Sequence, residues 1–157
     1  MIQRVYIDTS IIGGCLDQEF KEWSIKLFSE FKSGKKIAVI SDITFDELEF
    51  APKKVQKIIK QISPEFLEII ESNSEIENLA KQYILKGAVS EQFYQDALHI
   101  AVATYYNVNV LSSWNFKHIV NLDRIRKYNS VNLAQGFNIL EIRNPRDILI
   151  IEENENY

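Results

Sequence analysis

Acidic residues that could meet a cation or exchange protons stand at three widely separated points of the sequence. Asp8 directly follows the short apolar run 4–7, and Glu47 comes soon after a second such run, 36–40. Asp96 lies inside an otherwise apolar helical stretch, where an ionised carboxylate without a partner would be energetically costly. We therefore expect Asp96 to face a cation or hydrogen-bond donors in the folded chain.

An amide joins the acids as a fourth candidate, because Asn115 follows a later apolar run, 108–111. In an open parallel sheet, ligands bind outside the carboxyl ends of the strands, so these side chains could converge at one edge. Each residue also has a purely structural interpretation. Asp8 could cap a turn or helix, and Asn115 could cap a helix that starts directly after it. Glu47 lies three residues after Thr44, which is capping-box spacing.

The elements that would position these residues alternate along the chain. Five short apolar runs are typical of strands covered on both faces, and they span 4–7, 36–40, 66–70, 108–111 and 137–142. Helical stretches lie between them, at 19–31, 41–50, 54–62, 76–85 and 91–106. This alternation predicts an α/β fold with a central parallel sheet of four to five strands flanked by helices. We expect one domain over residues 1–151 and a frayed acidic tail over 152–157.

Composition restricts the kind of protein. The chain has 157 residues, of which 46% are hydrophobic, and this suits one packed globular domain. No apolar run approaches the roughly 20 residues needed to cross a bilayer, and the start of the sequence is wrong for a secretory signal. Cys15 is the single cysteine, so no internal disulfide can form. We therefore expect a reducing, cytoplasmic location.

The net charge of −4 argues against binding to nucleic acid by bulk attraction alone. It does not exclude an enzyme that acts on nucleic acid, because carboxylates that hold metal ions are neutralised in a working site. Lysine and arginine cluster locally at 53–57 and 124–127. We interpret both runs as solvated helix faces, and contact with RNA stays open for them.

Four short motifs carry a resemblance to a known family. In chain order they are Asp8-Thr9-Ser10, Thr44-x-x-Glu47-Leu48, Asp96-Ala97-x-x-Ile100-Ala101 and Ser113-x-Asn115-Phe116. None is specific alone, but the series resembles the motifs of PIN domains, and most of all the VapC-like ribonucleases of toxin–antitoxin pairs. The resemblance implies a PIN-like domain whose catalytic and metal-binding residues are Asp8, Glu47, Asp96 and Asn115. It also implies one or two Mg²⁺ or Mn²⁺ ions as cofactor, with Ser10 and Ser113 supporting the site.

The fourth position departs from the family pattern, because many relatives carry Asp where this chain has Asn115. Asn keeps one oxygen ligand but loses a negative charge, so a second ion would be held less tightly. The function implied is hydrolysis of RNA phosphodiester bonds by water that a divalent cation activates. The partners implied are an RNA substrate, a small antitoxin protein and a second copy in a homodimer, with no membrane.

Residues close to the motifs have open roles. Lys117 and His118 could contact substrate or be ordinary polar surface residues. Trp114 could stack on an unpaired base, although packing is the favoured interpretation. His99 follows Asp96 in an Asp-x-x-His pattern that resembles half of a di-iron motif, but this chain does not repeat the pattern.

Two other functions stay open. An Asp-nucleophile phosphatase of the haloacid-dehalogenase type would want a second acid two residues after Asp8, where this chain has Ser10. A catalytically weak PIN-fold module that binds RNA or protein would agree with Asn115 in the fourth position. The intact acids at positions 8, 47 and 96 argue against that second alternative.

Overall fold

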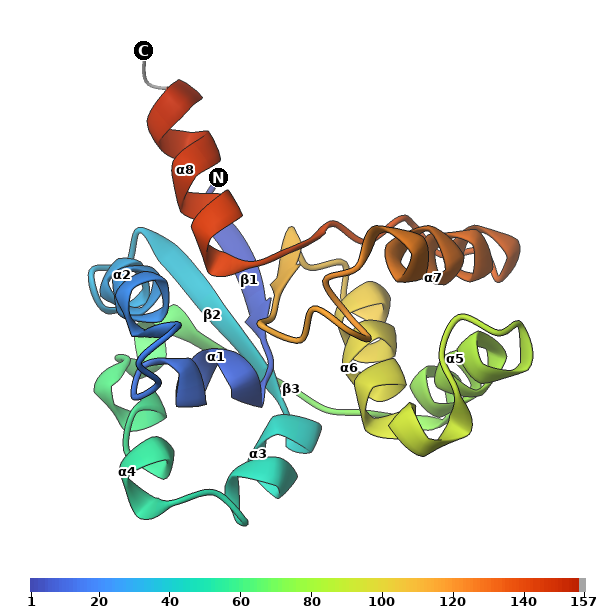
Figure 1. The fold of residues 1–157 in the computed structure, drawn as a ribbon, viewed down its shortest axis with the longest axis horizontal. Helices are drawn as coiled ribbons and strands as arrows, with labels where there is room; N and C mark the ends of the chain where they lie inside the picture. Colours follow the sequence, from blue (N-terminus) through green and yellow to red (C-terminus); the bar gives the residue numbers. More distant parts are fainter. Residues whose placement is uncertain (156–157) are drawn as a thin grey trace.

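A sheet of five parallel strands forms the centre of the fold, and helices cover both of its faces (Figure 1). The computed structural model describes residues 1–155, and for 151–153 and 155 it describes the backbone only. The strand order is β3-β2-β1-β4-β5, so the sheet grows in opposite directions on either side of β1. The strands are β1 Gln3–Ile7, β2 Lys36–Ser41, β3 Leu67–Ile70, β4 Val110–Ser112 and β5 Ile142–Arg143. The α/β fold class expected from the sequence is confirmed.

The helices form two groups on opposite faces of the sheet. In Figure 1 one face is covered by α1, α2, α4 and α8, and the other by α5, α6 and α7. The bounds are α1 Thr9–Gly14, α2 Lys21–Lys32, α3 Asp42–Leu48, α4 Lys53–Gln56, α5 Ser74–Leu85, α6 Tyr94–Tyr105, α7 Leu122–Ala134 and α8 Pro145–Glu155. Short 3₁₀ turns lie at Ile59–Gln61, Pro64–Phe66 and Glu91–Phe93. Helix α3 directly follows β2, so it lies at the carboxyl edge of the sheet.

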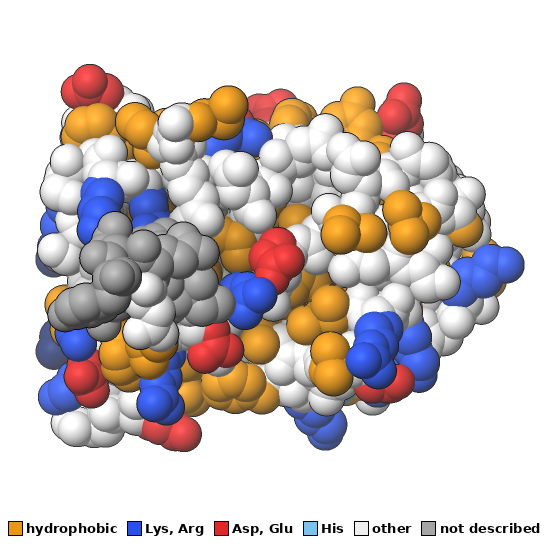
Figure 2. Space-filling view, turned by 90° about the horizontal axis from the view of Figure 1, so that it is seen from above, with side chains coloured by type: hydrophobic (Ala, Val, Ile, Leu, Met, Phe, Trp, Pro, Cys, Tyr) orange, Lys and Arg blue, Asp and Glu red, His pale blue; other side chains and the backbone are white. Residues whose placement is uncertain are grey.

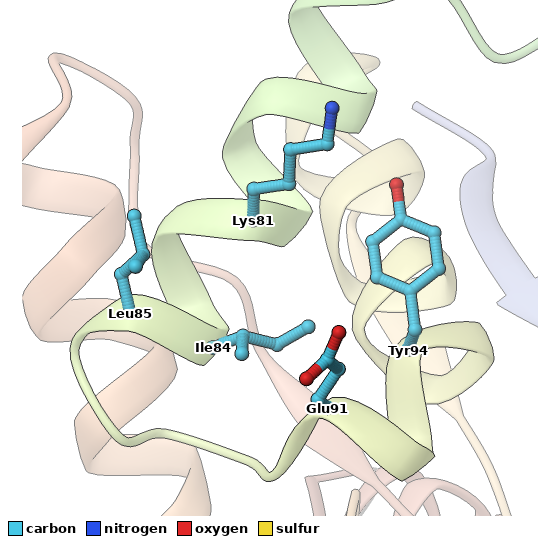
Figure 3. A pocket seen from close by; sticks show the side chains of 5 residues that line it. All are labelled: Lys81, Ile84, Leu85, Glu91 and Tyr94. Carbon is cyan, nitrogen blue, oxygen red and sulfur yellow. The ribbon is translucent and has the colours of Figure 1, made fainter.

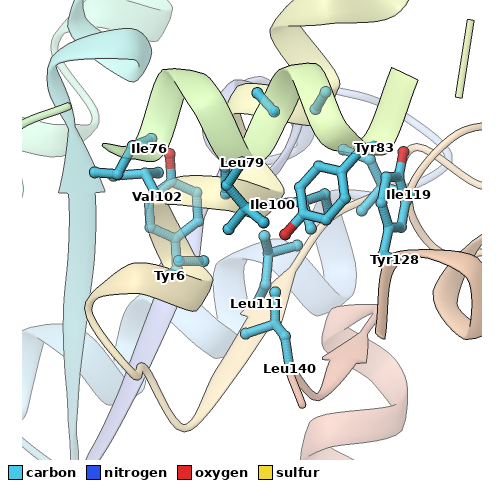
Figure 4. Close-up of a cluster of buried hydrophobic side chains, with 14 of the residues drawn as sticks. Tyr6, Ile76, Leu79, Tyr83, Ile100, Val102, Leu111, Ile119, Tyr128 and Leu140 are labelled. Carbon is cyan, nitrogen blue, oxygen red and sulfur yellow. The ribbon is translucent and has the colours of Figure 1, made fainter. Parts of the chain in front are cut away.

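Alternating residues of the central strands serve two separate cores, because strand side chains point to opposite faces in turn. Val5 and Ile7 of β1 pack with residues of α1 and α2. Tyr6, which lies between them, packs in the larger cluster with α5 and α6, drawn in Figure 4. All three side chains are fully buried. Burial on both faces explains why the sequence of β1 has no polar–apolar alternation.

The last predicted strand is the least accurate part of the sequence-based fold. We expected a strand over 137–142, but β5 is only Ile142–Arg143. The preceding residues form a loop that Asn129 of α7 holds, since its side chain accepts a hydrogen bond from the Leu140 amide at 2.7 Å and donates to the Leu140 carbonyl at 3.1 Å. The Asn129 side chain thus bonds the N–H and C=O of Leu140, which in a strand would pair with a neighbouring strand.

Two predicted helices are divided or shortened. The stretch 54–62 forms α4 and then a separate 3₁₀ turn, and the stretch 91–106 begins with a 3₁₀ turn before α6. No helix starts directly after Asn115, because the chain forms turns at 116–119. The helices α1, α7 and α8 had not been assigned from the sequence.

Helix α8 runs to Glu155, so the backbone of 152–155, which lies within the expected tail, is helical. The expected domain boundary after residue 151 stays a prediction. The rest of the expected tail, residues 156–157, lies outside the described residues. Within residues 1–155, none of the helices has the length and apolar character required to traverse a lipid bilayer.

Candidate active site

Asp8 lies at the carboxyl end of β1 and is almost fully buried, with 5% of its surface exposed. Its Oδ1 accepts hydrogen bonds from the Ser10 hydroxyl at 2.5 Å and from the Ile11 amide at 3.3 Å. Its Oδ2 accepts from the Ser113 hydroxyl at 2.5 Å. Asp8 is therefore the N-cap of α1, as the structural interpretation expected, and it is also a carboxylate with donors on both oxygens.

Two serines join the ends of β1 and β4 around Asp8. Ser113 follows β4, which pairs with β1 in parallel register, so its hydroxyl reaches a residue 105 positions earlier in the chain. Ser10 also accepts a hydrogen bond from the Trp114 amide at 2.9 Å. The two residues expected to support the site thus fix the orientation of Asp8.

Glu47 lies on α3, beside the same edge of the sheet. Its Oε2 accepts from the Thr9 hydroxyl at 2.5 Å, and its Oε1 lies 2.5 Å from Nε2 of His99. The capping-box interpretation of Glu47 is wrong, because the N-cap of α3 is Ser41, whose hydroxyl accepts from the Thr44 amide. The Glu47 carboxylate instead bonds side chains of α1 and α6.

Asp96 lies in the first turn of α6 and is partly buried. Burial raises the pKa of Asp96 to about 6, and repulsion from Asp8 and Glu47 contributes to the rise. Attraction by His99 and a hydrogen bond from Asn115 act in the opposite direction. The three carboxylates are therefore close enough to oppose one another's ionisation.

In the other two carboxyls, Asp8 and Glu47, burial raises the pKa while hydrogen-bonding partners and His99 lower it. Burial raises the pKa of Asp8, and repulsion from Glu47 adds to that rise, although His99 and the two serine hydroxyls lower it. For Glu47, burial also acts upward, but the hydrogen bond and charge of His99 outweigh it, so that its pKa is lowered. Glu47 is thus the member of the group that the protein keeps ionised most readily.

Asn115 takes part through both ends of its amide. Its Oδ1 accepts from the backbone amides of Lys117 at 3.2 Å and His118 at 3.0 Å, which closes the turn after β4. A hydrogen bond from Asn115 lowers the pKa of Asp96, so the amide nitrogen is the group directed at the acid. In this arrangement the side-chain amide of Asn115 donates a hydrogen bond to Asp96, and its oxygen does not face the acid.

The two residues predicted as possible substrate contacts differ in exposure. Lys117 is exposed, whereas His118 is buried and stacks on Phe93 with ring centroids 3.6 Å apart. Its Nδ1 is buried without a hydrogen-bond partner within residues 1–155. The idea that His118 is an ordinary surface residue is therefore wrong.

Trp114 packs inside the molecule, as the favoured interpretation expected. Its ring stacks on Phe20 with centroids 4.4 Å apart, and its indole N–H donates to the Ser24 hydroxyl at 2.8 Å. Only 9% of the residue is exposed, so an unpaired base has no access to the indole face.

Sequence reasoning missed two residues of this edge, Thr9 and His99. Both bond Glu47, and His99 also acts electrostatically on Asp8 and Asp96. A signal was present for His99, because Asp-x-x-His spacing puts it one helical turn after Asp96, on the same face of α6.

The chemistry of these side chains fits a hard divalent cation. Carboxylate oxygens are the ligands that Mg²⁺ and Mn²⁺ prefer, and a cation would relieve the repulsion that raises the pKa of Asp96. As they stand, no three His, Cys, Asp or Glu side chains that the structure describes form a ready-made group of metal ligands.

A different part of the surface contains a hollow. It lies between α5 and the start of α6 and is lined by Lys81, Ile84, Leu85, Glu91 and Tyr94 (Figure 3). None of these residues belongs to the acidic group formed by Asp8, Glu47 and Asp96, or bonds a member of it. The candidate site is therefore the carboxyl edge of the sheet and not this hollow.

Fold and sequence together place the chain in a known family. The family model of the PIN domain matches residues 5–118, a range that includes the three candidate acids and the amide Asn115. The chain belongs to the PIN domain family.

Solved structures with the same fold come from three bacteria. VapC20 of Mycobacterium tuberculosis, described as a toxin that cleaves the sarcin–ricin loop, has a TM-score of 0.55 at 12% identity, over 87% of this chain and 98% of that one. VapBC2 of Rickettsia felis, bound to a DNA fragment from its promoter, has a TM-score of 0.57 at 17% identity, over 90% and 98%. FitAcB of Neisseria gonorrhoeae has a TM-score of 0.57 at 14% identity, over 90% and 97%. No curated protein matches the sequence significantly.

Proposed function

We propose that this protein is a divalent-metal-dependent ribonuclease, the toxin of a type II toxin–antitoxin pair. The observation that carries the proposal is the group of three carboxylates at the carboxyl edge of the sheet, where Ser113 joins Asp8 to the end of β4 and Glu47 bonds His99 of α6, the helix that carries Asp96. Family membership and the fold shared with a toxin described as cleaving the sarcin–ricin loop support the same activity.

Asp8, Glu47 and Asp96 would hold Mg²⁺ or Mn²⁺ in this proposal. When bound, such a cation acidifies water and offsets charge on a phosphate oxygen, which are the two needs of phosphodiester hydrolysis. The chain itself orients the carboxylates: the hydroxyls of Ser10 and Ser113 fix Asp8. Asn115 donates to Asp96 and adds no negative charge, so we expect one tightly held ion rather than two.

The substrate would enter from the exposed side of the same edge. Lys117 is exposed in the turn after β4 and would contact a phosphate of the RNA backbone. Figure 2 shows the opposite end of the molecule, where α8 ends, and there Lys and Arg side chains are interspersed with Asp and Glu. RNA is thus expected to be attracted locally rather than by the overall charge of −4.

An antitoxin protein would bind close to the site. Phe45 lies on α3 with Glu47, and Phe50 follows directly after that helix, with 38% and 92% of their surfaces exposed. Apolar side chains at such positions suit a protein partner that covers the acidic edge. We also propose that the toxin acts as a homodimer.

A second function is favoured by one observation. No three ligand side chains that the structure describes are grouped for metal binding. A PIN-fold module that binds RNA or protein without cleaving it would agree with this arrangement. A phosphatase is disfavoured, because both oxygens of Asp8 accept hydrogen bonds and Ser10 stands where such enzymes need a second acid.

One assay separates these functions. The purified protein should cleave RNA with added Mn²⁺ or Mg²⁺ and stop when EDTA is added. Cleavage should be lost in Asp8→Asn and in Asp96→Asn but kept in Asp123→Asn, a matched change of an exposed aspartate on α7. Cleavage that survives both Asp8→Asn and Asp96→Asn would eliminate the site, whereas RNA binding without cleavage in any metal would favour the non-catalytic module.

A further inference from the structure

His99 of α6 is buried at the centre of the acidic group and uses both of its ring nitrogens. Nε2 lies 2.5 Å from Oε1 of Glu47, and Nδ1 lies 2.6 Å from the hydroxyl of Tyr6 on β1. Only 2% of the histidine is exposed. A buried imidazole with two specific partners is held in one orientation, because turning the ring would leave both nitrogens unsatisfied.

The chain of hydrogen bonds continues from Tyr6 back to the helix that carries Glu47. The Tyr6 hydroxyl lies 2.7 Å from the hydroxyl of Ser41, the N-cap residue of α3. Glu47 lies near the other end of α3. The four residues Ser41, Tyr6, His99 and Glu47 therefore form a closed bridge from α3 through β1 and α6 and back to α3.

One proton arrangement satisfies every member of this bridge with a neutral imidazole. Ser41 donates to Tyr6, Tyr6 donates to Nδ1 of His99, and Nε2–H then donates to Glu47. In the neutral imidazole the Tyr6 hydroxyl thereby fixes the tautomer in which the hydrogen points at the carboxylate, and a charged imidazole would keep the same N–H directed at Glu47. The second oxygen of Glu47 accepts from Thr9.

We propose that His99 is a positioning residue that keeps the Glu47 carboxylate in the acidic group, with Tyr6 fixing the direction of its N–H. The proposal rests on the proposed function, in which Glu47 helps to hold the cation. Glu47 needs such a restraint, because it is partly exposed and Asp8 and Asp96 repel it. Without a donor from α6, only the Thr9 hydroxyl would restrain its flexible side chain.

The chain offers a matched pair of variants for the test. Tyr6→Phe and Tyr83→Phe each delete one hydroxyl from a fully buried tyrosine of the same core cluster. The Tyr83 hydroxyl bonds Asn132 and Thr104, which are no part of the acidic group. A merely structural role for Tyr6 predicts that the two variants behave alike, whereas a positioning role predicts that only Tyr6→Phe affects metal binding.

The experiment measures the Mn²⁺ dissociation constant of the full chain by titration calorimetry, with thermal unfolding in EDTA as a check of folding. We expect Tyr6→Phe to weaken Mn²⁺ binding roughly tenfold, the lower end of what residues that bond a metal ligand contribute. Tyr83→Phe should lose comparable stability but bind Mn²⁺ as the unmodified protein does.

Substitution of His99 itself supplies a second comparison. His99→Leu should weaken Mn²⁺ binding by about ten- to a hundredfold, and His99→Gln, which keeps an N–H near the position of Nε2, should restore most of the affinity. Equal affinities for Tyr6→Phe and Tyr83→Phe, or Mn²⁺ binding unchanged or tighter in His99→Leu, would overturn the positioning role alone. Failure of the unmodified protein to bind Mn²⁺ would overturn the proposed function, and this role with it.

Discussion

Asp96 occupies a position that disfavours its charged form. Burial, together with repulsion from Asp8 and Glu47, raises its pKa to about 6, against 3.8 for an unperturbed carboxyl. A carboxyl whose pKa rises on folding destabilises the folded protein wherever it is ionised. The destabilisation is therefore fully present above pH 6 and is relieved as the pH falls from 6 toward 3.8.

Replacement of Asp96 by Asn should stabilise the metal-free protein at pH 7.5 while abolishing RNA cleavage. The expected gain in the free energy of unfolding is roughly 1 kcal/mol, after allowance for solvent screening of a partly exposed group. This corresponds to a rise in Tm of about 2–4 °C, measured by thermal unfolding in EDTA. The gain should shrink at pH 4, where Asp96 is already protonated in the unmodified protein. A lower Tm at pH 7.5 would contradict the argument.

At the same scale, the sequence predicted the acids of the edge and the two serines that bond Asp8, but not the partners of Glu47. Asp8 was recognised because it directly follows an apolar strand, and Asp96 because it interrupts an apolar helix. His99 and Thr9 were not assigned to Glu47, since they are 52 and 38 residues away from it in the chain. Such contacts arise only when α6 and α1 pack beside α3, and local patterns do not contain that information.

Among the elements, α1 is held against α2 by a close approach at one glycine. A Cβ at Gly14 would lie 2.5 Å from the Ser24 hydroxyl and 2.9 Å from the indole nitrogen of Trp114. Those two atoms also form a hydrogen bond with each other, so they have little freedom to move. By contrast, a Cβ at the neighbouring Gly13 would meet nothing within 4 Å.

These two glycines give opposite predictions for the same substitution. Gly14→Ala should destabilise the fold by about 1–3 kcal/mol, because the added methyl overpacks the contact between α1 and α2. Gly13→Ala should stabilise it by about 0.5–1 kcal/mol, because alanine is the better helix former. Denaturant unfolding of the two variants measures the difference. Similar effects of both substitutions would show that the close contact does not restrain α1.

The predicted elements were accurate where periodicity and burial agree. Strands β1 and β2 lie within one residue of their predicted ranges, because residues covered on both faces are apolar throughout. The predicted strand 137–142 failed, because the side chain of Asn129 bonds the backbone at Leu140 and leaves only two residues to pair with β4. An apolar run alone cannot distinguish a strand from a loop held by such a side chain.

For the whole molecule, the strand order decides where chemistry can occur. The chain reverses its direction across the sheet between β1 and β4, and the residues that follow these two strands, Asp8 and Ser113, are joined by a hydrogen bond. This is the position at which open parallel sheets bind ligands. The acidic edge is therefore a property of the topology, and residues from four motifs meet there only in the complete fold.

Metal binding at that edge should be visible in the stability of the entire chain. A ligand that binds only the folded state stabilises it by about 2.7 kcal/mol at 100 times its Kd, or about 5–10 °C in Tm for a chain of this size. Mn²⁺ should therefore raise the Tm, and EDTA should reverse the change.

The size of this shift should depend on pH and on Asp8. Because protons compete with the cation for Asp96, the shift should be largest above pH 7 and should decline as the pH falls through 6. Asp8→Asn should abolish the shift, whereas Asp123→Asn, an equal change of charge on the exposed face of α7, should leave it intact. A shift of the same size in both variants would mean that Mn²⁺ binds elsewhere on the protein, because only Asp8 belongs to the acidic edge.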